Sequence, residues 1–505
     1  MGKNYVLAID QSTQGTKAIL FDGQKRLVCR HDIAHKQYVN ERGWVSHDLE
    51  EIYRNTVRAV RGLVEEAGVC KSDIACIGIS NQRETSAAWN RRTGEPLAPA
   101  VVWQCARAQG ICERVRQNAD IGHGSGRGQG GDVAEKIRQK TGLLLSPYFP
   151  AAKFAWLQEN VEAVRHAGKE GELCFGTIDT WLLFRLTKGA VYATDYSNAS
   201  RTQLFNLHTL EWDDEICTWF GIDRDNLPQV CDSSYFYGST DLEGWFEEPV
   251  PICGIIGDSQ GALFGQGCVK KGMIKATYGT GSSVMMFAGE KPIQSKLGLV
   301  TSLAWGIGGK AGYVLEGNIN YTGAVITWLK NDMQLITSEQ ETEELAYQAN
   351  QGDTTYLVPA FSGLGAPYWK PEARAVLSGM GRATGKKEIV KAALESIAYQ
   401  IADVVEMMRA ESGGALEALC VDGGPTNNAY LMQFQGDILG IPVKLPDCEE
   451  ASALGAAMLA GLAHGIYQES GLFTGAAKRR FYPRMERRER DARYLGWKEA
   501  VNMLH

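Results

Sequence analysis

Short apolar runs alternate with polar segments along the chain, and this spacing is typical of strands and helices joined by turns. Residues 5–9 and 18–21 predict two β-strands, because each run is apolar, short and bounded by polar residues. The stretch DQSTQGTK joins them and predicts a hairpin near the N-terminus. It offers backbone N–H groups, hydroxyls, one carboxylate and one cation, which suit a phosphate or its metal ion. An ordinary polar turn is the alternative.

The sequence pattern of this hairpin is repeated later in the chain. Residues 6–21 read VLAIDQSTQGTKAILF, and residues 273–288 read MIKATYGTGSSVMMFA, which aligns with them without a gap. A recurrence this distant indicates two similar domains, and we place the boundary near Gly261, giving domains 1–260 and 261–505. A cleft between them would bring both hairpins onto one ligand, which favours phosphate binding.

The remaining pattern predicts an α/β fold. Apolar residues at helical spacing indicate one helix over 47–68, with Asp48 placed to cap it, and a long amphipathic helix over 386–410. Residues 72–90 predict two strands around a polar segment. Residues 418–440 predict strand, glycine turn and helix, and residues 453–466 predict a closely packing helix rich in small residues.

Composition narrows the class of protein. The chain has 505 residues, 44% hydrophobic and 22% charged, as expected for a folded protein of two or three domains. A net charge of −7 argues against nucleic acid as the main partner, and the basic stretch 478–493 contains enough acids to be a solvated helix face. No apolar run reaches about 18 residues, so we expect no membrane span.

Two further features bear on compartment and ligand. The twelve cysteines include no Cys-x-x-Cys pair, which favours reduced thiols and a cytoplasmic location. We see no signal peptide at the N-terminus. The glycine-rich segment 121–132 lacks the Gly-Lys-Ser/Thr ending of a P-loop and predicts a surface insertion.

Four places could carry chemistry. Asp258 ends an apolar strand and could serve as a general base or as a helix cap. Arg83 and Glu84 could read polyol hydroxyls or form a surface ion pair. Trp103 could cover the C–H face of such a substrate or belong to the core. Gly424 lies in a glycine turn that could seat a nucleotide or serve packing alone.

These motifs together resemble the FGGY family of carbohydrate kinases over almost the whole chain. Twelve of them stand in the family's order: DQSTQGTK, NQRET, WQC, PYFPAAKFAWLQEN, GTIDTWLLF, GDSQGALFGQ, TYGTGS, LEGNINYTGAVITWL, PAFSGLGAPYW, ALESIAYQ, VDGGPTNN and ALGAAMLAGLA. The pairing of NQRET with WQC is most similar to the branch that phosphorylates glycerol. The resemblance implies two actin-like (ribonuclease H-like) domains flanking a central cleft for ATP and substrate.

The resemblance also implies roles for individual residues. ATP and Mg²⁺ are the implied nucleotide and metal, and Asp258 is the implied base that activates a primary hydroxyl. The implied polyol contacts are Arg83, Glu84, Trp103, Tyr148, Asp258 and Ser259. The implied nucleotide and phosphate contacts are Thr13, Gln14, Gly15, Lys17, Gly279, Thr280, Gly323, Gly424 and Asn428, with Asp10 near the metal.

Several residues depart from the pattern of that branch. Ser259 stands where a Gln is usual and Ser283 where a Phe is usual, while Gln14 and Lys17 replace a hydroxyl residue and an Arg. The two serines would widen the substrate end. We therefore keep a kinase of a longer polyol or ketose, such as erythritol, xylulose or ribulose, as the alternative to glycerol.

Other classes fit less well. An actin-like or chaperone-like ATPase shares the two hairpins but needs no polyol site, and a non-catalytic sugar sensor would lack Asp258. A dinucleotide-dependent oxidoreductase would need Gly-x-Gly-x-x-Gly after the first strand, which is not there. The expected partners are ATP and a small polyol or sugar, with no nucleic acid and no membrane. The sequence leaves a homo-oligomer, dimer or tetramer, open.

Overall fold

A long mixed β-sheet runs through the computed structural model, which describes residues 4–118, 132–365, 368, 370, 372–414, 416–473 and 479–504. Within these residues the sheet has thirteen strands. From edge to edge they are β24 (Arg479–Phe481), β23 (Val443–Leu445), β22 (Leu419–Asp422), β16 (Ile274–Tyr278), β17 (Ser282–Gly289), β19 (Lys310–Ile319), β18 (Val300–Ile307), β14 (Ser234–Thr240), β15 (Val250–Gly257), β6 (Ile74–Asn81), β1 (Tyr5–Gln11), β2 (Gly15–Asp22) and β3 (Leu27–Ala34).

The sheet contains the same strand arrangement twice. β1 pairs antiparallel with β2 and parallel with β6, while β16 pairs antiparallel with β17 and parallel with β22. We call β14, β15, β6, β1, β2 and β3 the first half and the other seven strands the second half. The halves meet where Ser234 of β14 pairs with Ile307 of β18. The two similar sequence segments thus form the same strand arrangement. The predicted α/β class is confirmed.

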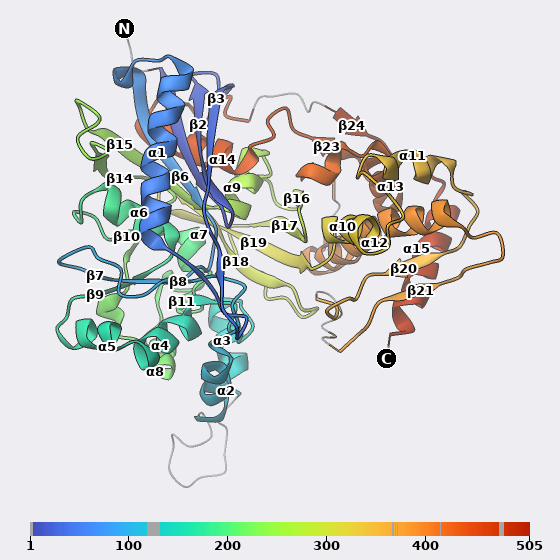
Figure 1. The fold of residues 1–505 in the computed structure, drawn as a ribbon, viewed down its shortest axis with the longest axis horizontal. Coiled ribbons are helices and arrows are strands. Elements are labelled where there is room, and N and C mark those ends of the chain that lie inside the picture. Colours follow the sequence, from blue (N-terminus) through green and yellow to red (C-terminus); the bar gives the residue numbers. More distant parts are fainter. Residues whose placement is uncertain are drawn as a thin grey trace.

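Helices cover both faces of the first half (Figure 1). Leu7 and Ile9 face the core formed with α1 (Leu49–Ala67) and α6 (Ile178–Leu186). Val6 and Ala8 face the opposite core, formed with α9 (Asp258–Gly265) and α14 (Ala451–His464). Because successive side chains of a strand point to opposite faces, burial on both faces requires the continuous apolar run seen in the sequence.

The second half carries its own core. The long helix α12 (Lys386–Ser412) packs against α10 (Gly323–Asn331), α11 (Glu341–Gln348) and α13 (Ala429–Leu439), with α15 (Arg487–Asn502) beyond α13. α12 and α15 pack against the short hairpin of β20 (Tyr356–Val358) and β21 (Val376–Ser378), on the right in Figure 1. The predicted helices over 47–68, 386–410 and 453–466 are confirmed as α1, α12 and α14.

A further layer of small elements covers the lower left of Figure 1. It comprises β4 (Tyr38–Val39), β5 (Val45–His47), β7 (Ala87–Asn90), β8 (Ala100–Val101), α2 (Gln109–Asn118), α3 (Val133–Thr141), α4 (Pro150–Asn160), α5 (Glu162–Lys169), β9 (Leu173–Gly176), β10 (Ala193–Asp195), α7 (Tyr196–Ala199), β11 (Phe205–Asn206), β12 (Glu211–Trp212), α8 (Asp214–Phe220) and β13 (Gln229–Cys231). Three single turns of 3₁₀ helix complete the fold: η1 (Lys71–Asp73), η2 (Arg224–Asn226) and η3 (Gly424–Asn427).

Local signals explain where several elements begin. The Asp48 carboxylate accepts from the backbone N–H groups of Glu50 and Glu51 and caps α1 as predicted. Asn428 caps α13 by accepting from the N–H of Leu431. Residues 121–131 of the glycine-rich segment lie outside the described residues. None of the described helices combines the length and the apolar character needed to cross a bilayer.

Close helix packing positions the start of α9. A Cβ on Gly455 of α14 would lie 2.0 Å from the carbonyl oxygen of Gly261 on α9, and one on Gly78 of β6 would lie 2.3 Å from the carbonyl oxygen of Ala456. Only glycine permits such approaches. The predicted domain boundary at Gly261 stays a prediction, and that residue lies inside α9.

We expect Gly455→Ala to lower the free energy of unfolding by about 1–3 kcal/mol, because the added methyl group forces α14 and α9 apart. Urea unfolding followed by tryptophan fluorescence measures this. Gly110→Ala is the matched control, since Gly110 on α2 has open space around it and alanine there favours the helix. Equal destabilisation by the two changes would contradict the close packing.

Candidate active site

The carboxyl ends of three parallel strands meet at one place in the first half. In the sheet register Asp10 of β1 lies beside Ser80 of β6, and Asn81 of β6 lies beside Gly257 of β15. The residues that follow these strand ends therefore gather together. They include Arg83, Glu84 and Asp258, which are far apart in the sequence.

Four buried charges form the floor of this site, and we call them the four-charge network: Arg83, Glu84, Arg201 and Glu316. Arg83 Nη1 and Nη2 donate to the two carboxylate oxygens of Glu316 at 3.0 and 2.8 Å. Arg201 Nε donates to Glu84, and Arg201 Nη1 lies 2.9 Å from Glu316 Oε2. Glu316 belongs to β19, so the second half supplies one of the four charges.

The network is electrically balanced, with two guanidinium groups and two carboxylates. Burial by itself would raise the pKa of Glu316, but the attraction of Arg201 and Arg83 outweighs it and lowers that pKa below its ordinary value. Burial opposes the charge of Arg83 too, yet Glu316 and Glu84 raise its pKa. Arg83 and Glu316 thus stay ionised, and each of these charges depends on its partners.

Asp258 stands at the edge of this network. Its carboxylate is 38% exposed, and its Oδ1 lies 3.3 Å from Arg83 Nε and accepts from the N–H of Ser259 at 2.6 Å. Gly257 occupies the N-cap position of α9 and Asp258 is the first helical residue, so the helix-cap alternative does not describe it. An accessible carboxylate with one free oxygen can accept a proton from a nearby hydroxyl.

Two aromatic rings stand near the charged floor. The rings of Trp103 and Tyr148 have centroids 5.6 Å apart, and Trp103 Nε1 donates to Thr13 Oγ1 at 3.0 Å. Burial, with the nearby carboxylate of Glu84, raises the pKa of Tyr148, so its phenol keeps its proton and can donate. Trp103 therefore links the predicted polyol site to the first hairpin.

Asp10 is a buried carboxylate at the end of β1. Burial raises its pKa to about 6, against the lowering effects of the Lys17 ammonium and a hydrogen bond with Ser80, and the negative charges of Asp258 and Glu450 add to the rise. A hard cation would relieve this excess of negative charge, so Asp10 fits a Mg²⁺ ion held jointly by a carboxylate, phosphate oxygens and water. Within the described ranges no group of three or more His, Cys, Asp or Glu side chains is placed to hold a metal ion.

The first hairpin has a tight polar turn. The N–H and hydroxyl of Ser12 donate to the carbonyl oxygen of Gly15 at 2.8 and 3.0 Å, while Gln14 is exposed. A Cβ on Gly15 would lie 2.7 Å from the carbonyl oxygen of Ile33, so the close approach of β3 requires glycine. The predicted phosphate contacts of Thr13, Gln14, Gly15 and Lys17 stay predictions.

Lys17 and Glu450 link this hairpin to α14. The ammonium of Lys17 lies 2.8 Å from Glu450 Oε2, and Arg30 of β3 pairs with the other carboxylate oxygen. Glu450 is the residue before the first turn of α14. Lys17, which the sequence assigns to a phosphate, thus has its ammonium bound by the carboxylate of Glu450.

The second hairpin is braced by the start of α10. The N–H of Gly323 donates to the carbonyl oxygen of Gly279 at 2.9 Å, and the N–H groups of Thr322 and Ala324 donate to that of Thr280. A Cβ on Gly323 would lie 2.6 Å from the Gly279 oxygen. The contact between turn and helix therefore requires glycine at position 323.

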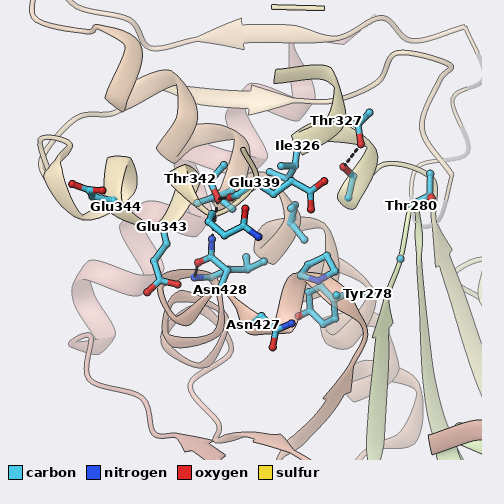
Figure 2. Close-up of a pocket in the computed structure, with 18 of the residues that line it drawn as sticks. Tyr278, Thr280, Ile326, Thr327, Glu339, Thr342, Glu343, Glu344, Asn427 and Asn428 are labelled. Atoms are coloured by element: carbon cyan, nitrogen blue, oxygen red, sulfur yellow. Dashed lines mark hydrogen bonds between the residues drawn. The ribbon is translucent and has the colours of Figure 1, made fainter. Parts of the chain in front are cut away.

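A cavity of about 950 Å³ opens beside this hairpin (Figure 2). Asn428 and Thr342 meet on its wall, where Asn428 Nδ2 donates to Thr342 Oγ1 at 3.1 Å. Five predicted nucleotide contacts line it: Gly279, Thr280, Gly323, Gly424 and Asn428. Its size suits a nucleoside. Thr13, Gln14, Gly15 and Lys17 are not among its lining residues.

Two residues of the four-charge network were missed by the sequence reasoning. Glu316 is a lone charge inside the apolar run YVLEGNI, and that isolation was a usable signal for a buried, paired carboxylate. Arg201 stands in a mixed segment with no comparable signal. Ser283 reaches the network as well, since its hydroxyl donates to Glu316 Oε1 at 3.3 Å.

We expect Glu316→Gln to lower the free energy of unfolding by about 3–5 kcal/mol, because it leaves two buried guanidinium groups facing one carboxylate. Glu172→Gln is the matched control, since Glu172 pairs with Arg92 on the surface and its loss should leave stability near that of the unchanged protein. Urea unfolding of both variants decides. Similar curves for the two would contradict a mutually dependent network.

Comparison with known proteins agrees with this architecture. The N-terminal domain of the FGGY family of carbohydrate kinases matches residues 5–265, and the family's C-terminal domain matches residues 274–464. Glycerol kinase of Caldanaerobacter subterraneus subsp. tengcongensis is 47% identical over 499 residues, covering 98% of each chain. Glycerol kinase 2 of Thermotoga maritima is 47% identical over 500 residues, covering 99% of this chain and 98% of its own.

Solved structures share the fold. The structure of Plasmodium falciparum glycerol kinase with ADP superposes with a TM-score of 0.90 at 34% identity, covering 99% of this chain and 98% of its own. Xylulose kinase from Lactobacillus acidophilus superposes at 0.85 with 20% identity, covering 99% of this chain and 97% of its own, and so shares the fold. The predicted pair of actin-like domains is confirmed, and the chain belongs to the FGGY family of carbohydrate kinases.

Proposed function

We propose that this chain transfers the γ-phosphoryl group of ATP to a primary hydroxyl of glycerol, giving glycerol 3-phosphate and ADP, with Mg²⁺ as the metal. The similarity to glycerol kinases over nearly the whole chain supports this acceptor. The single observation that carries the chemistry is Asp258, an accessible carboxylate held beside Arg83 at the strand ends. The comparisons do not favour the longer polyol or ketose alternative, since the xylulose kinases of Lactobacillus acidophilus and Rhodospirillum rubrum are only 20% and 18% identical to this chain.

The acceptor site follows from the charged floor and the aromatic rings. A small polyol alternates hydroxyls with C–H groups, so it needs both donors and acceptors on one side and an apolar surface on the other. Arg83, Glu84 and Tyr148 supply the polar contacts, and Trp103 supplies the apolar face. Ser259 and Ser283 complete the site from α9 and β17.

Asp258 then performs the proton step. Its carboxylate accepts the proton of the attacking hydroxyl and aims that oxygen at the γ-phosphorus. Its closeness to Arg83 keeps it oriented, since Arg83 is itself fixed by Glu316. Phosphoryl transfer depends mainly on such positioning and on charge neutralisation.

The nucleotide occupies the cavity lined by Gly279, Thr280, Gly323, Gly424 and Asn428, with its phosphates directed toward the first hairpin. Thr13, Gln14, Gly15 and Lys17 approach these phosphates. Asp10 would hold Mg²⁺ together with phosphate oxygens. When bound, the metal neutralises charge on the transferring group.

We also propose the domain division 1–260 and 261–505, with the reaction between the two parts and closure excluding water. A cytoplasmic location fits the twelve free cysteines, most of them buried. A homo-oligomer stays a prediction from the sequence.

Glycerol should be the preferred acceptor in a coupled assay of ADP release. We expect kcat/KM for glycerol to exceed the values for erythritol, xylulose and ribulose, because glycerol kinases are 47% identical to this chain over nearly its whole length. A preference for one of the longer acceptors would replace glycerol but keep the kinase. ADP release that no acceptor accelerates would refute the kinase itself.

Asp258→Asn should lower kcat by about 10²–10⁴-fold, because the amide cannot accept the proton of the hydroxyl. The same coupled assay measures this, with ADP binding as evidence that the variant is folded. Asp214→Asn, a change on an exposed side chain of α8, is the matched control and should leave kcat unchanged. A kcat of Asp258→Asn within a few-fold of the unchanged enzyme would assign the proton to another group.

A further inference from the structure

Lys153 is a fully buried lysine in α4. None of its surface is exposed, although the ammonium group is costly to remove from water. Lys153 lies in the first turn of α4, which begins at Pro150 after the N-cap residue Phe149. Tyr148 immediately precedes Phe149. A buried ammonium needs hydrogen-bond acceptors, and the identity of those acceptors indicates what the residue does.

The ammonium of Lys153 bonds to two backbone carbonyl oxygens, and both belong to residues of the proposed polyol site. Lys153 Nζ donates to the carbonyl oxygen of Tyr148 and lies 3.5 Å from that of Glu84. It also lies 5.9 Å from the centre of the Tyr148 ring. One side chain therefore contacts two segments that are remote in sequence, and each segment carries a residue assigned to the polyol.

The Glu84 backbone needs such support. Its φ is +61°, a left-handed conformation that costs a non-glycine residue free energy. Its carboxylate is bound by Arg201, whereas its carbonyl oxygen faces Lys153. Arg201 therefore fixes the side chain of Glu84, and Lys153 contacts its backbone carbonyl.

Four other ionisable groups face the ammonium of Lys153. They are the Glu84 carboxylate, the thiols of Cys105 and Cys112, and the Arg107 guanidinium. Burial lowers the pKa of Lys153 to about 7. The protonated donor is therefore fully present in mildly acidic solution and is lost as the pH rises through neutrality.

We propose that Lys153 is a positioning residue for the acceptor, tying the backbones of Glu84 and Tyr148 together so that both side chains meet one polyol. It touches neither the acceptor nor ATP and acts through the two residues it holds. The inference rests on the proposed function, because it concerns the same acceptor site. It predicts that loss of Lys153 weakens acceptor binding and spares the nucleotide site.

The test measures the acceptor KM, kcat and the Kd of ADP for Lys153→Met. We expect the acceptor KM to rise about tenfold or more, because two buried carbonyls lose their charged donor, while the Kd of ADP stays within about twofold. Lys391→Met is the matched control. Lys391 is a buried lysine of α12 that donates to the carbonyl oxygen of Asn350, and its loss should lower the Tm without changing the acceptor KM.

The pH profile provides a second readout that a purely structural role would not move. In the unchanged enzyme the acceptor KM should rise from pH 6 to pH 9, as the ammonium loses its proton. In Lys153→Arg, whose guanidinium stays charged, this rise should disappear. The comparison of the unchanged enzyme with Lys153→Arg also decides the matter if Lys153→Met does not fold. Cys105, Cys112 and Arg107 are the same in these two proteins, so a difference between their pH profiles comes from position 153.

Three results would overturn the proposal. They are an acceptor KM within twofold of normal in active Lys153→Met, equal losses of acceptor and ADP binding in Lys153→Met, and a pH profile that Lys153→Arg leaves unaltered. The assay uses the acceptor that the unchanged enzyme prefers. An unchanged enzyme with no active acceptor would refute the proposed function, whereas an active one with a silent Lys153 would refute this inference alone.

Discussion

The balance of four buried charges is the constraint on which the acceptor site depends. Arg83 and Glu84 are assigned to the polyol, and each is also bound within the network, Arg83 to Glu316 and Glu84 to Arg201. In a low-dielectric interior such groups cannot reorient without exposing an unpaired charge. The arrangement thus fixes the geometry of the floor before any substrate arrives, and preorganised polar groups are what positional catalysis requires. Because Glu316 comes from β19, the floor also binds the second half of the sheet to the first.

Sheet topology decides where this floor lies. β1, β6 and β15 are parallel neighbours, so their carboxyl ends place Asp10, Arg83 and Asp258 in one region. The glycine contacts between α9 and α14 then hold the first turn of α9, and with it Asp258, close to the strand ends. On the other side, α10 braces the second hairpin, beside the cavity that we propose for the nucleotide. The acceptor and nucleotide sites are therefore built by the same repeated arrangement of strands, each half contributing a hairpin.

Lysines illustrate how context decides the role of a charge. Lys17, in the first hairpin, keeps part of its surface and pairs with Glu450. Lys153, fully buried, faces two carbonyl oxygens and no paired carboxylate, so its charge is sensitive to pH near neutrality. The first contacts a carboxylate at the surface of the hairpin, whereas the second contacts the backbone of two segments.

The sequence by itself determined the repeat, the α/β class and most of the helices, since apolar periodicity and turn residues are local properties that survive whatever the chain packs against. It also indicated the family, because the motifs around Asp258, Arg83, Glu84 and the glycine turns are specific to it, while the roles of these residues stay predictions. Only the tertiary structure decided that Glu316 and Arg201 complete the acceptor floor, that Glu450 holds Lys17, and that Lys153 joins Glu84 to Tyr148. The physical reason is that an ion pair or a buried hydrogen bond is defined by distance in space, and residues separated by tens to hundreds of positions leave no periodic trace of it along the chain.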